Sequence, residues 1–212
     1  MQKKTWLWLE WALAFGLVPS AIAAWLPPAG WIPVLWLAAL GAAWQLRRKT
    51  AAGKLQPQIG WPGEKSELRR LGLRALGVTA ALVSLVLLWV PQRLFDFPRE
   101  RTVLWLAVVV LYPLLSVYPQ ELICRRWFFD RYALLFGEGR IMVAASALSF
   151  GWLHIVFKNP VAVALASVGG WLFAETYRRN RSLRLVCLEH ALYGDLIFTI
   201  GLGAFFYHGA VR

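Results

Sequence analysis

The chain has 212 residues, of which 59% are hydrophobic, and its mean hydropathy is +0.53. These values exclude a soluble globular domain and indicate an integral membrane protein. The net charge of +12 comes from Lys and Arg residues that cluster between apolar segments, without the stripe of basic and aromatic side chains typical of nucleic-acid binding. We therefore expect membrane lipids as partners and no nucleic acid.

Apolar segments recur along the chain, and they predict an all-α integral membrane protein of about seven transmembrane helices. Trp side chains near the ends of several segments are typical of the membrane interface. The predicted spans are residues 6–25, the segment from the proline-rich turn at 27–33 to residue 44, and residues 75–90, 103–117, 141–157, 161–174 and 185–206.

Residues 1–74 are predicted to form an N-terminal helical hairpin and a basic loop, and residues 75–212 the membrane core. In the loop, we expect residues 53–63 to be irregular and residues 64–74 to form an amphipathic helix on the lipid headgroups. Cytoplasmic loops are rich in Lys and Arg, so this loop should face the cytoplasm of a multi-pass inner (cytoplasmic) membrane protein. Its basic residues are Arg47, Arg48, Lys49, Lys54, Lys65, Arg69, Arg70 and Arg74.

A carboxylate lies where the fourth predicted span ends. A helix that begins at Pro119 would place Glu121 and Arg125 one turn apart on the same face. The arginines in and after this segment predict a separate helix that lies near the cytoplasmic surface or partly re-enters the membrane, and a topology in which this helix crosses the membrane stays open as the alternative. Ionisable groups at membrane depth are functional candidates, so Glu121 is a candidate catalytic residue that Arg125 would orient.

Two histidines lie inside later apolar segments. His154 is one turn after Phe150, and His190 is one turn before Gly194, which Asp195 follows. Peptide-bond hydrolysis needs a base that activates water, a donor that stabilises the oxyanion, and a cavity that admits water. A carboxylate can be the base, and imidazoles can bind the water or stabilise the oxyanion. We therefore expect the three segments to meet around one water-accessible cavity.

The first of these segments resembles a motif of the CAAX-protease and bacteriocin-processing family of intramembrane endopeptidases (CPBP, also called ABI). That motif is Glu-Glu-x-x-x-Arg, and Gln120-Glu121-Leu-Ile-Cys-Arg125 matches it except at the first position. The resemblance covers residues 118–207, and the chain there is similar to a CPBP core.

The other two segments resemble the remaining motifs of the same family. Phe-x-x-x-His is matched in full by Phe150 and His154. His-x-x-x-Asn is matched by His190, with Gly194 in place of the asparagine and Asp195 after it. The order of the motifs, and their places on successive hydrophobic segments, make the combined resemblance more specific than any one motif.

The resemblance implies an intramembrane endopeptidase that hydrolyses peptide bonds of membrane-associated peptides or protein C-termini. It implies glutamate-type chemistry with no required cofactor, and it assigns catalysis to Glu121, His154 and His190. Family activities include prenyl-protein processing, bacteriocin maturation or immunity, and trimming of C-terminal sorting anchors. Of these, we expect the prenylated substrates least.

Two departures from the motifs bear on activity. Gln120 is an amide and cannot act as a general base, so Glu121 must activate the water or the chain is inactive. Gly194 removes an amide that would aid the oxyanion, and Asp195 can donate in its place only when protonated. The alternative hypothesis is therefore a catalytically impaired family member that acts as a membrane scaffold or a bacteriocin-immunity protein.

Simpler interpretations of the same residues stay open. Glu121 and Arg125 could form a structural ion pair, and His154 and His190 could be packing residues. The carboxylate and the two imidazoles would also suit a zinc ion with one open coordination position, which is a minority possibility. The sequence identifies neither the substrate nor an oligomeric state.

Overall fold

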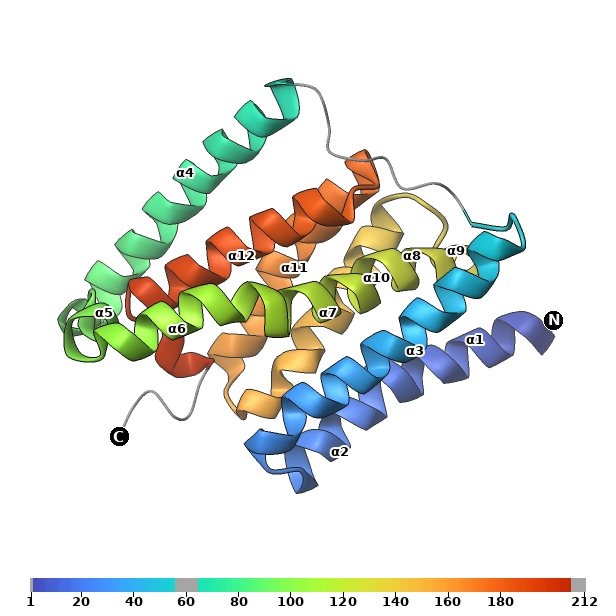
Figure 1. Ribbon diagram of the computed structural model, residues 1–212, viewed down its shortest axis with the longest axis horizontal. Helices are drawn as coiled ribbons and strands as arrows, with labels where there is room; N and C mark the ends of the chain where they lie inside the picture. The colour runs from blue at the N-terminus through green and yellow to red at the C-terminus, as the bar shows by residue number, and fades with distance from the viewer. Residues whose placement is uncertain (1, 56–64, 207–212) are drawn as a thin grey trace.

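The computed structural model describes residues 2–55 and 65–206, and this part of the chain consists of helices and their connections (Figure 1). The expected all-α class is confirmed. The helices are α1 (Gln2–Ala12), α2 (Val18–Trp25), α3 (Trp31–Ala51), α4 (Lys65–Trp89), α5 (Asp96–Glu100), α6 (Thr102–Tyr112), α7 (Tyr118–Glu121), α8 (Phe128–Arg131), α9 (Ala133–Phe136), α10 (Arg140–Leu153), α11 (Pro160–Asn180) and α12 (Leu183–Thr199).

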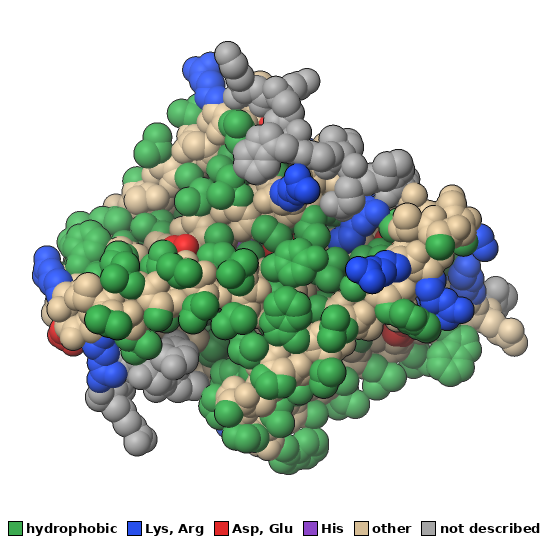
Figure 2. Space-filling view, in the orientation of Figure 1, with side chains coloured by type: hydrophobic (Ala, Val, Ile, Leu, Met, Phe, Trp, Pro, Cys, Tyr) green, Lys and Arg blue, Asp and Glu red, His purple; other side chains and the backbone are tan. Residues whose placement is uncertain are grey.

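Five helical segments of the described chain are long and apolar enough to cross a membrane, where the sequence predicts about seven. Hydrophobic side chains cover most of the face in Figure 2, as expected of a surface that contacts lipid. The chain is therefore a multi-pass membrane protein. The five segments are Gln2–Trp25, Pro28–Ala51, Ser66–Trp89, Thr102–Arg131 and Arg140–Phe157.

The segment that contains Glu121 differs from the prediction. We expected a span that ends before Pro119 and a separate short helix, but α6, α7 and α8 join into one helical segment, Thr102–Arg131. Wider π-helical turns, Pro113–Val117 and Leu122–Trp127, connect them. A proline inside a helix lacks the N–H that an α-helical bond needs, and a π-helical turn accommodates such a break without ending the helix. Glu121 therefore lies inside a continuous helical segment that is long and apolar enough to cross a membrane.

The basic loop also differs in part from the prediction. The expected amphipathic helix at residues 64–74 continues without a break into the third span, because α4 runs from Lys65 to Trp89. Residues 56–64 lie outside the described residues, so the predicted irregular segment 53–63 is described only at its start. Residue 207, the last of the segment with the family motifs, also lies outside them.

The basic clusters lie at the same ends of successive helices. In Figure 1 these ends lie along the upper-right edge, from the start of α4 at the top to the start of α1 at the right. The α11–α12 connection, the end of α8 and the end of α3 lie between them. The basic residues of successive helices are therefore gathered on one side of the described chain. The residues are Lys3, Lys4, Arg47, Arg48, Lys49, Arg69, Arg70, Arg126, Arg131, Arg140, Arg178, Arg179, Arg181 and Arg184.

Helices α10 and α11 form a close hairpin in the core. A Cβ added to Gly151 would lie 1.9 Å from Ser167 Oγ, and one added to Gly170 would lie 3.2 Å from Ala147 Cα. Small residues of this kind let two helix backbones approach each other inside a membrane. The hairpin brings the end of α10, where His154 lies, against the rest of the core.

The connection between α10 and α11 is fixed by local sequence. α10 ends in the 3₁₀ turn His154–Phe157, and Pro160 begins α11. Asn159 caps α11, since its Oδ1 accepts a hydrogen bond of 2.8 Å from the Ala162 backbone N–H. Its Nδ2 donates to the Phe205 carbonyl at 2.8 Å. The cap therefore also holds the segment after α12 beside the turn that carries His154.

Candidate active site

Glu121 and Arg125 form a buried ion pair within the helical segment 102–131. Neither side chain has exposed surface, and Arg125 Nε lies 3.1 Å from Glu121 Oε2. The Nη1 atom of Arg125 donates to Ser146 Oγ at 3.0 Å and to the Cys124 carbonyl at 3.1 Å. These contacts hold the guanidinium against α10 and fix the carboxylate beside it, because a buried charge is stable only with a partner.

His190 joins this pair from α12. Its Nδ1 lies 2.8 Å from Glu121 Oε1, and its Nε2 lies 2.9 Å from the hydroxyl of Tyr112. A carboxylate accepts hydrogen bonds, so Nδ1 carries a hydrogen and donates it to Glu121. Both ring nitrogens of His190 are thus in contact with side chains, and a line of polar groups runs from Tyr112 through His190 to Glu121 and Arg125.

His154 lies apart from that line, at the end of α10. Its Nδ1 lies 2.8 Å from the Phe150 carbonyl, and since a carbonyl only accepts, Nδ1 carries the hydrogen. The Nε2 of neutral His154 is then an acceptor. His154 as a residue is partly exposed, whereas His190 is 4% exposed and Glu121 is fully buried.

The phenyl ring of Phe150 is the wall that both histidines share. Its centroid lies 4.8 Å from the His154 ring and 5.3 Å from the His190 ring. The guanidinium carbon of Arg125 lies 4.8 Å from the same centroid, a cation–π geometry. The structure therefore brings Glu121 and His190 into direct contact and connects His154 to them through Phe150.

The positions that depart from the family motifs have different surroundings. Gln120 donates from Nε2 to Ser116 Oγ at 2.6 Å, one turn earlier on the same helical segment. Gly194 is buried against α6, and a Cβ added to it would lie 2.4 Å from the Tyr112 hydroxyl oxygen and 2.3 Å from its Cε1. Asp195 has a buried Oδ1 without a hydrogen bond in the described part of the chain.

Asp195 lines an open groove of about 320 Å³ between α4, α6 and α12. Trp105 and Val109 of α6 form one wall, and Thr199 of α12 lies at the groove with Asp195. The groove is mostly apolar, and none of the three predicted catalytic residues lines it. It is therefore distinct from the contacts around Glu121.

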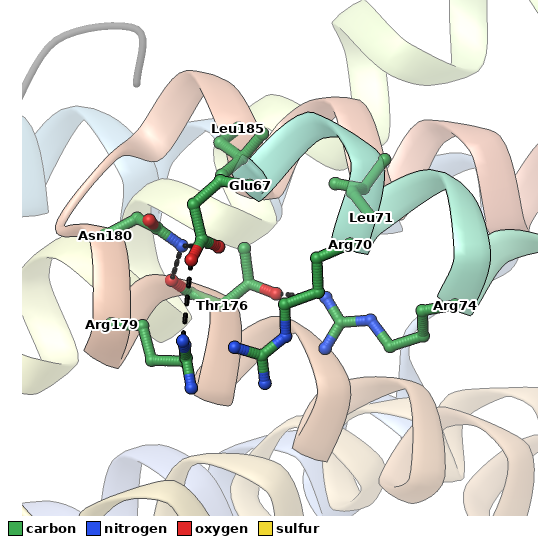
Figure 3. A pocket seen from close by; sticks show the side chains of 8 residues that line it. All are labelled: Glu67, Arg70, Leu71, Arg74, Thr176, Arg179, Asn180 and Leu185. Carbon is green, nitrogen blue, oxygen red and sulfur yellow. Dashed lines mark hydrogen bonds and ion pairs between the residues drawn. The ribbon is translucent and has the colours of Figure 1, made fainter. Parts of the chain in front are cut away.

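Polar contacts hold α4 to the core near its first turns. Arg74 pairs with the fully buried Glu189, the residue before His190, and also donates to Thr176 of α11. Figure 3 shows Arg74 and Thr176 around a small pocket, with Glu67 of α4 3.3 Å from Asn180 Nδ2. A second ion pair, in which Glu189 is fully buried and Arg74 is partly exposed, thus lies directly beside His190.

The sequence reasoning missed Tyr112 and Arg74. Tyr112 could have been found from its hydroxyl, because a phenol inside an apolar span usually needs a hydrogen-bond partner. Arg74 belongs to the basic segment before the third predicted span, and its sequence position gives no sign that it reaches a buried carboxylate of α12. Both lie on helices that precede the motifs.

The described residues contain no group of three or more His, Cys, Asp or Glu side chains placed to hold a metal ion. Glu121 and His190 do lie in contact, but the Nδ1 of His154 faces a backbone carbonyl of its own helix. The arrangement fits proton transfer and hydrogen bonding by side chains.

Residues 100–194 match the family model described as Type II CAAX prenyl endopeptidase Rce1-like. The match confirms the resemblance to the CPBP family, and it implies an intramembrane protease of the CAAX prenyl endopeptidase type. It covers α6 with Tyr112 as well as the three motif segments. Searches of curated proteins and of solved structures found no match to the chain.

Proposed function

We propose that this chain, whose residues 100–194 match the Rce1-like CAAX prenyl endopeptidases, hydrolyses peptide bonds of membrane-associated peptides or protein C-termini in the cytoplasmic membrane. The observation that supports this most is the contact of the buried Glu121 with His190, since it joins two family motifs in one polar cluster. The family match makes a prenylated protein C-terminus the first substrate to test, although we expected that class least from the sequence.

His154 is suited to receive the proton of the attacking water. Its Nδ1–H donates to the Phe150 carbonyl, so Nε2 offers a lone pair, and His154 as a residue is less buried than His190. In the proposed reaction the water oxygen bonds to the substrate carbonyl carbon, and the water proton passes to His154 Nε2. The carbonyl oxygen takes up the negative charge. When the C–N bond breaks, the leaving nitrogen takes the proton from His154.

Glu121 is suited to act through His190. The sequence suggested that its carboxylate polarises the water directly, but its two oxygens face His190 and Arg125, and the side chain is fully buried. A carboxylate at Nδ1 fixes the orientation of an imidazole and the position of its proton, as in hydrolases with a carboxylate–histidine pair. We therefore assign Glu121 to position His190 beside the substrate carbonyl oxygen, while His154 takes the water proton. No step of this reaction requires a metal ion or a cofactor.

The test is turnover of a quenched fluorescent peptide that ends in a prenylated Cys-aliphatic-aliphatic-X sequence, with the peptide lacking the prenyl group alongside. We expect His154→Ala and Glu121→Gln to lower the rate by roughly 10²–10⁴-fold, the usual contribution of a positioned proton-transfer group. Glu175→Gln is the matched control, because Glu175 is a partly exposed carboxylate paired with Arg178 on α11. Equal rates in the wild type and all three variants would refute the proposal.

The second candidate function is a membrane scaffold or immunity protein that binds a hydrophobic peptide without cleaving it. One observation favours it: Glu121 is enclosed by protein, and neither it nor the two histidines line the groove between α4, α6 and α12. Binding of the intact peptide by the purified protein, with no cleavage at any concentration, would support the scaffold over the enzyme.

A further inference from the structure

Gly194 leaves a space that another side chain fills. A Cβ at this position would lie 2.3 Å from Tyr112 Cε1, 2.6 Å from Cζ and 2.4 Å from the hydroxyl oxygen. Cβ atoms essentially never come that close to other atoms, so the ring of Tyr112 can lie here only because position 194 has no side chain. The three atoms nearest to the missing Cβ all belong to Tyr112.

The hydroxyl of Tyr112 meets the same histidine that begins the third motif. It lies 2.9 Å from His190 Nε2, and His190 and position 194 are one turn apart on α12. A side chain at position 194 would therefore project beside the His190 ring. The Tyr112 phenol of α6 therefore occupies the place where the family motif would put an asparagine side chain of α12.

We propose that Tyr112, together with Gly194, replaces the asparagine of the third motif: its hydroxyl holds His190 in the resting site and turns its one hydrogen toward the oxyanion of the substrate during the reaction. The inference deepens the proposed function and rests on it. A hydroxyl, like an amide, is a hydrogen-bond donor, so the substitution preserves the type of group while it moves the group from α12 to α6.

The position of Tyr112 suits both parts of this role. The Phe198 ring packs against the Tyr112 ring at a centroid distance of 5.3 Å, which fixes the phenol beside α12. Tyr112 as a residue is partly exposed, unlike His190 and Glu121, and its hydroxyl is the α6 end of the polar line. The hydroxyl hydrogen can rotate about the C–O bond from His190 Nε2 toward the oxyanion as charge develops. No covalent bond to Tyr112 forms or breaks.

The first test is hydrolysis of the prenylated peptide by Tyr112→Phe, which keeps the ring and removes the hydroxyl. Loss of one oxyanion donor should lower kcat by roughly 10²–10³-fold with little change in KM. Tyr118→Phe is the control, because Tyr118 is a 44% exposed phenol in the same helical segment. A Tyr112→Phe rate within about threefold of wild type, in an active protein, would overturn the inference and leave the proposed function standing.

The second test restores the family motif. Tyr112→Ala removes the ring that blocks position 194, and the double variant Tyr112→Ala with Gly194→Asn places the amide there. We expect the double variant to be at least tenfold faster than Tyr112→Ala alone, which corresponds to about 1.4 kcal/mol. Gly194→Asn with Tyr112 present should be the slowest of the set, because the two side chains cannot share the space. A double variant no faster than Tyr112→Ala would overturn the inference that Tyr112 replaces the asparagine.

The third test does not depend on turnover. The chain has three histidines, so ¹⁵N-histidine labelling gives a simple NMR spectrum, and His190→Gln identifies the resonances of His190. Tyr112→Phe should shift the His190 Nε2 resonance, and Tyr118→Phe should leave it unchanged. An unchanged Nε2 resonance in Tyr112→Phe would overturn the inference even if the wild type proved inactive. A shift in a protein without activity would support the Tyr112–His190 contact and count against the proposed function alone.

Discussion

The buried pair of Glu121 and Arg125 can be tested without a substrate. Neither side chain has exposed surface, and the charged atoms lie 3.1 Å apart. At that distance an effective dielectric constant of about 20 gives an attraction of about 5 kcal/mol, which offsets the cost of removing both charges from water. Removal of one partner forfeits the attraction and leaves the other charge buried and unpaired.

We expect Glu121→Gln and Arg125→Met each to lower the free energy of unfolding by about 3–5 kcal/mol. The double variant should lose much less than the sum of the single losses, because it contains no unpaired charge at this position. The measurement is reversible unfolding in mixed micelles of increasing SDS fraction, followed by circular dichroism.

The matched control is the pair of Glu175 and Arg178 on α11. Its oxygen and nitrogen lie 2.8 Å apart, but the side chains are 24% and 32% exposed. Partly exposed pairs contribute about 0–1 kcal/mol, so Glu175→Gln and Arg178→Met should have small effects. If Glu121→Gln and Arg125→Met also cost less than about 1 kcal/mol, the buried charges are not coupled and the reasoning fails.

Three further predictions concern the packing around the site, with the free energy of unfolding as the measurement. Gly151→Ala should destabilise the α10–α11 hairpin by about 1–3 kcal/mol, because the new Cβ would lie 1.9 Å from Ser167 Oγ. Asn159→Ala should cost about 0.5–2 kcal/mol, because it removes the cap of α11. Arg74→Met should cost about 3–5 kcal/mol, since it leaves the buried Glu189 without its cation, and Glu189→Gln in the same chain should recover part of the loss.

Controls separate these effects from general damage. Gly41→Ala should be neutral or stabilising, because a Cβ there meets nothing within 4 Å and alanine favours a helix. Ser167→Ala combined with Gly151→Ala should be less damaging than Gly151→Ala alone. A Gly151→Ala protein as stable as Gly41→Ala would contradict the close approach of α10 and α11. An Asn159→Ser protein should keep most of the stability, since serine also caps helices.

The helical membrane class and the three polar segments could be predicted from the sequence, because hydrophobic length and scarce ionisable groups are local signals. The continuity of the helical segment 102–131 could not be predicted from the sequence. Pro113 and Pro119 usually mark helix ends, and their accommodation by π-helical turns depends on contacts with α3, α10 and α12 that no local pattern reveals.

Within the site, the contact between neighbouring residues could be predicted from the sequence, and the contacts between distant helices could not. The spacing of Glu121 and Arg125 predicted an ion pair, and the structure has it. The partners of His190 and Glu189 come from helices that are distant in sequence, α6 for Tyr112 and α4 for Arg74. Pairings of this kind depend on which helices become neighbours. A single sequence therefore identifies the possible hydrogen-bond donors and acceptors, but not which donor meets which acceptor.

The bond from Asn159 to the Phe205 carbonyl has a practical implication for shortened versions of the protein. Phe206, the next residue, places its ring 5.9 Å from the imidazole of His154. A truncation that stops just after α12 would keep every motif residue. It would nevertheless remove the Phe206 ring beside His154 and the Phe205 carbonyl that accepts the hydrogen bond from Asn159. Boundaries chosen from the motifs alone would therefore alter the very histidine they were meant to preserve.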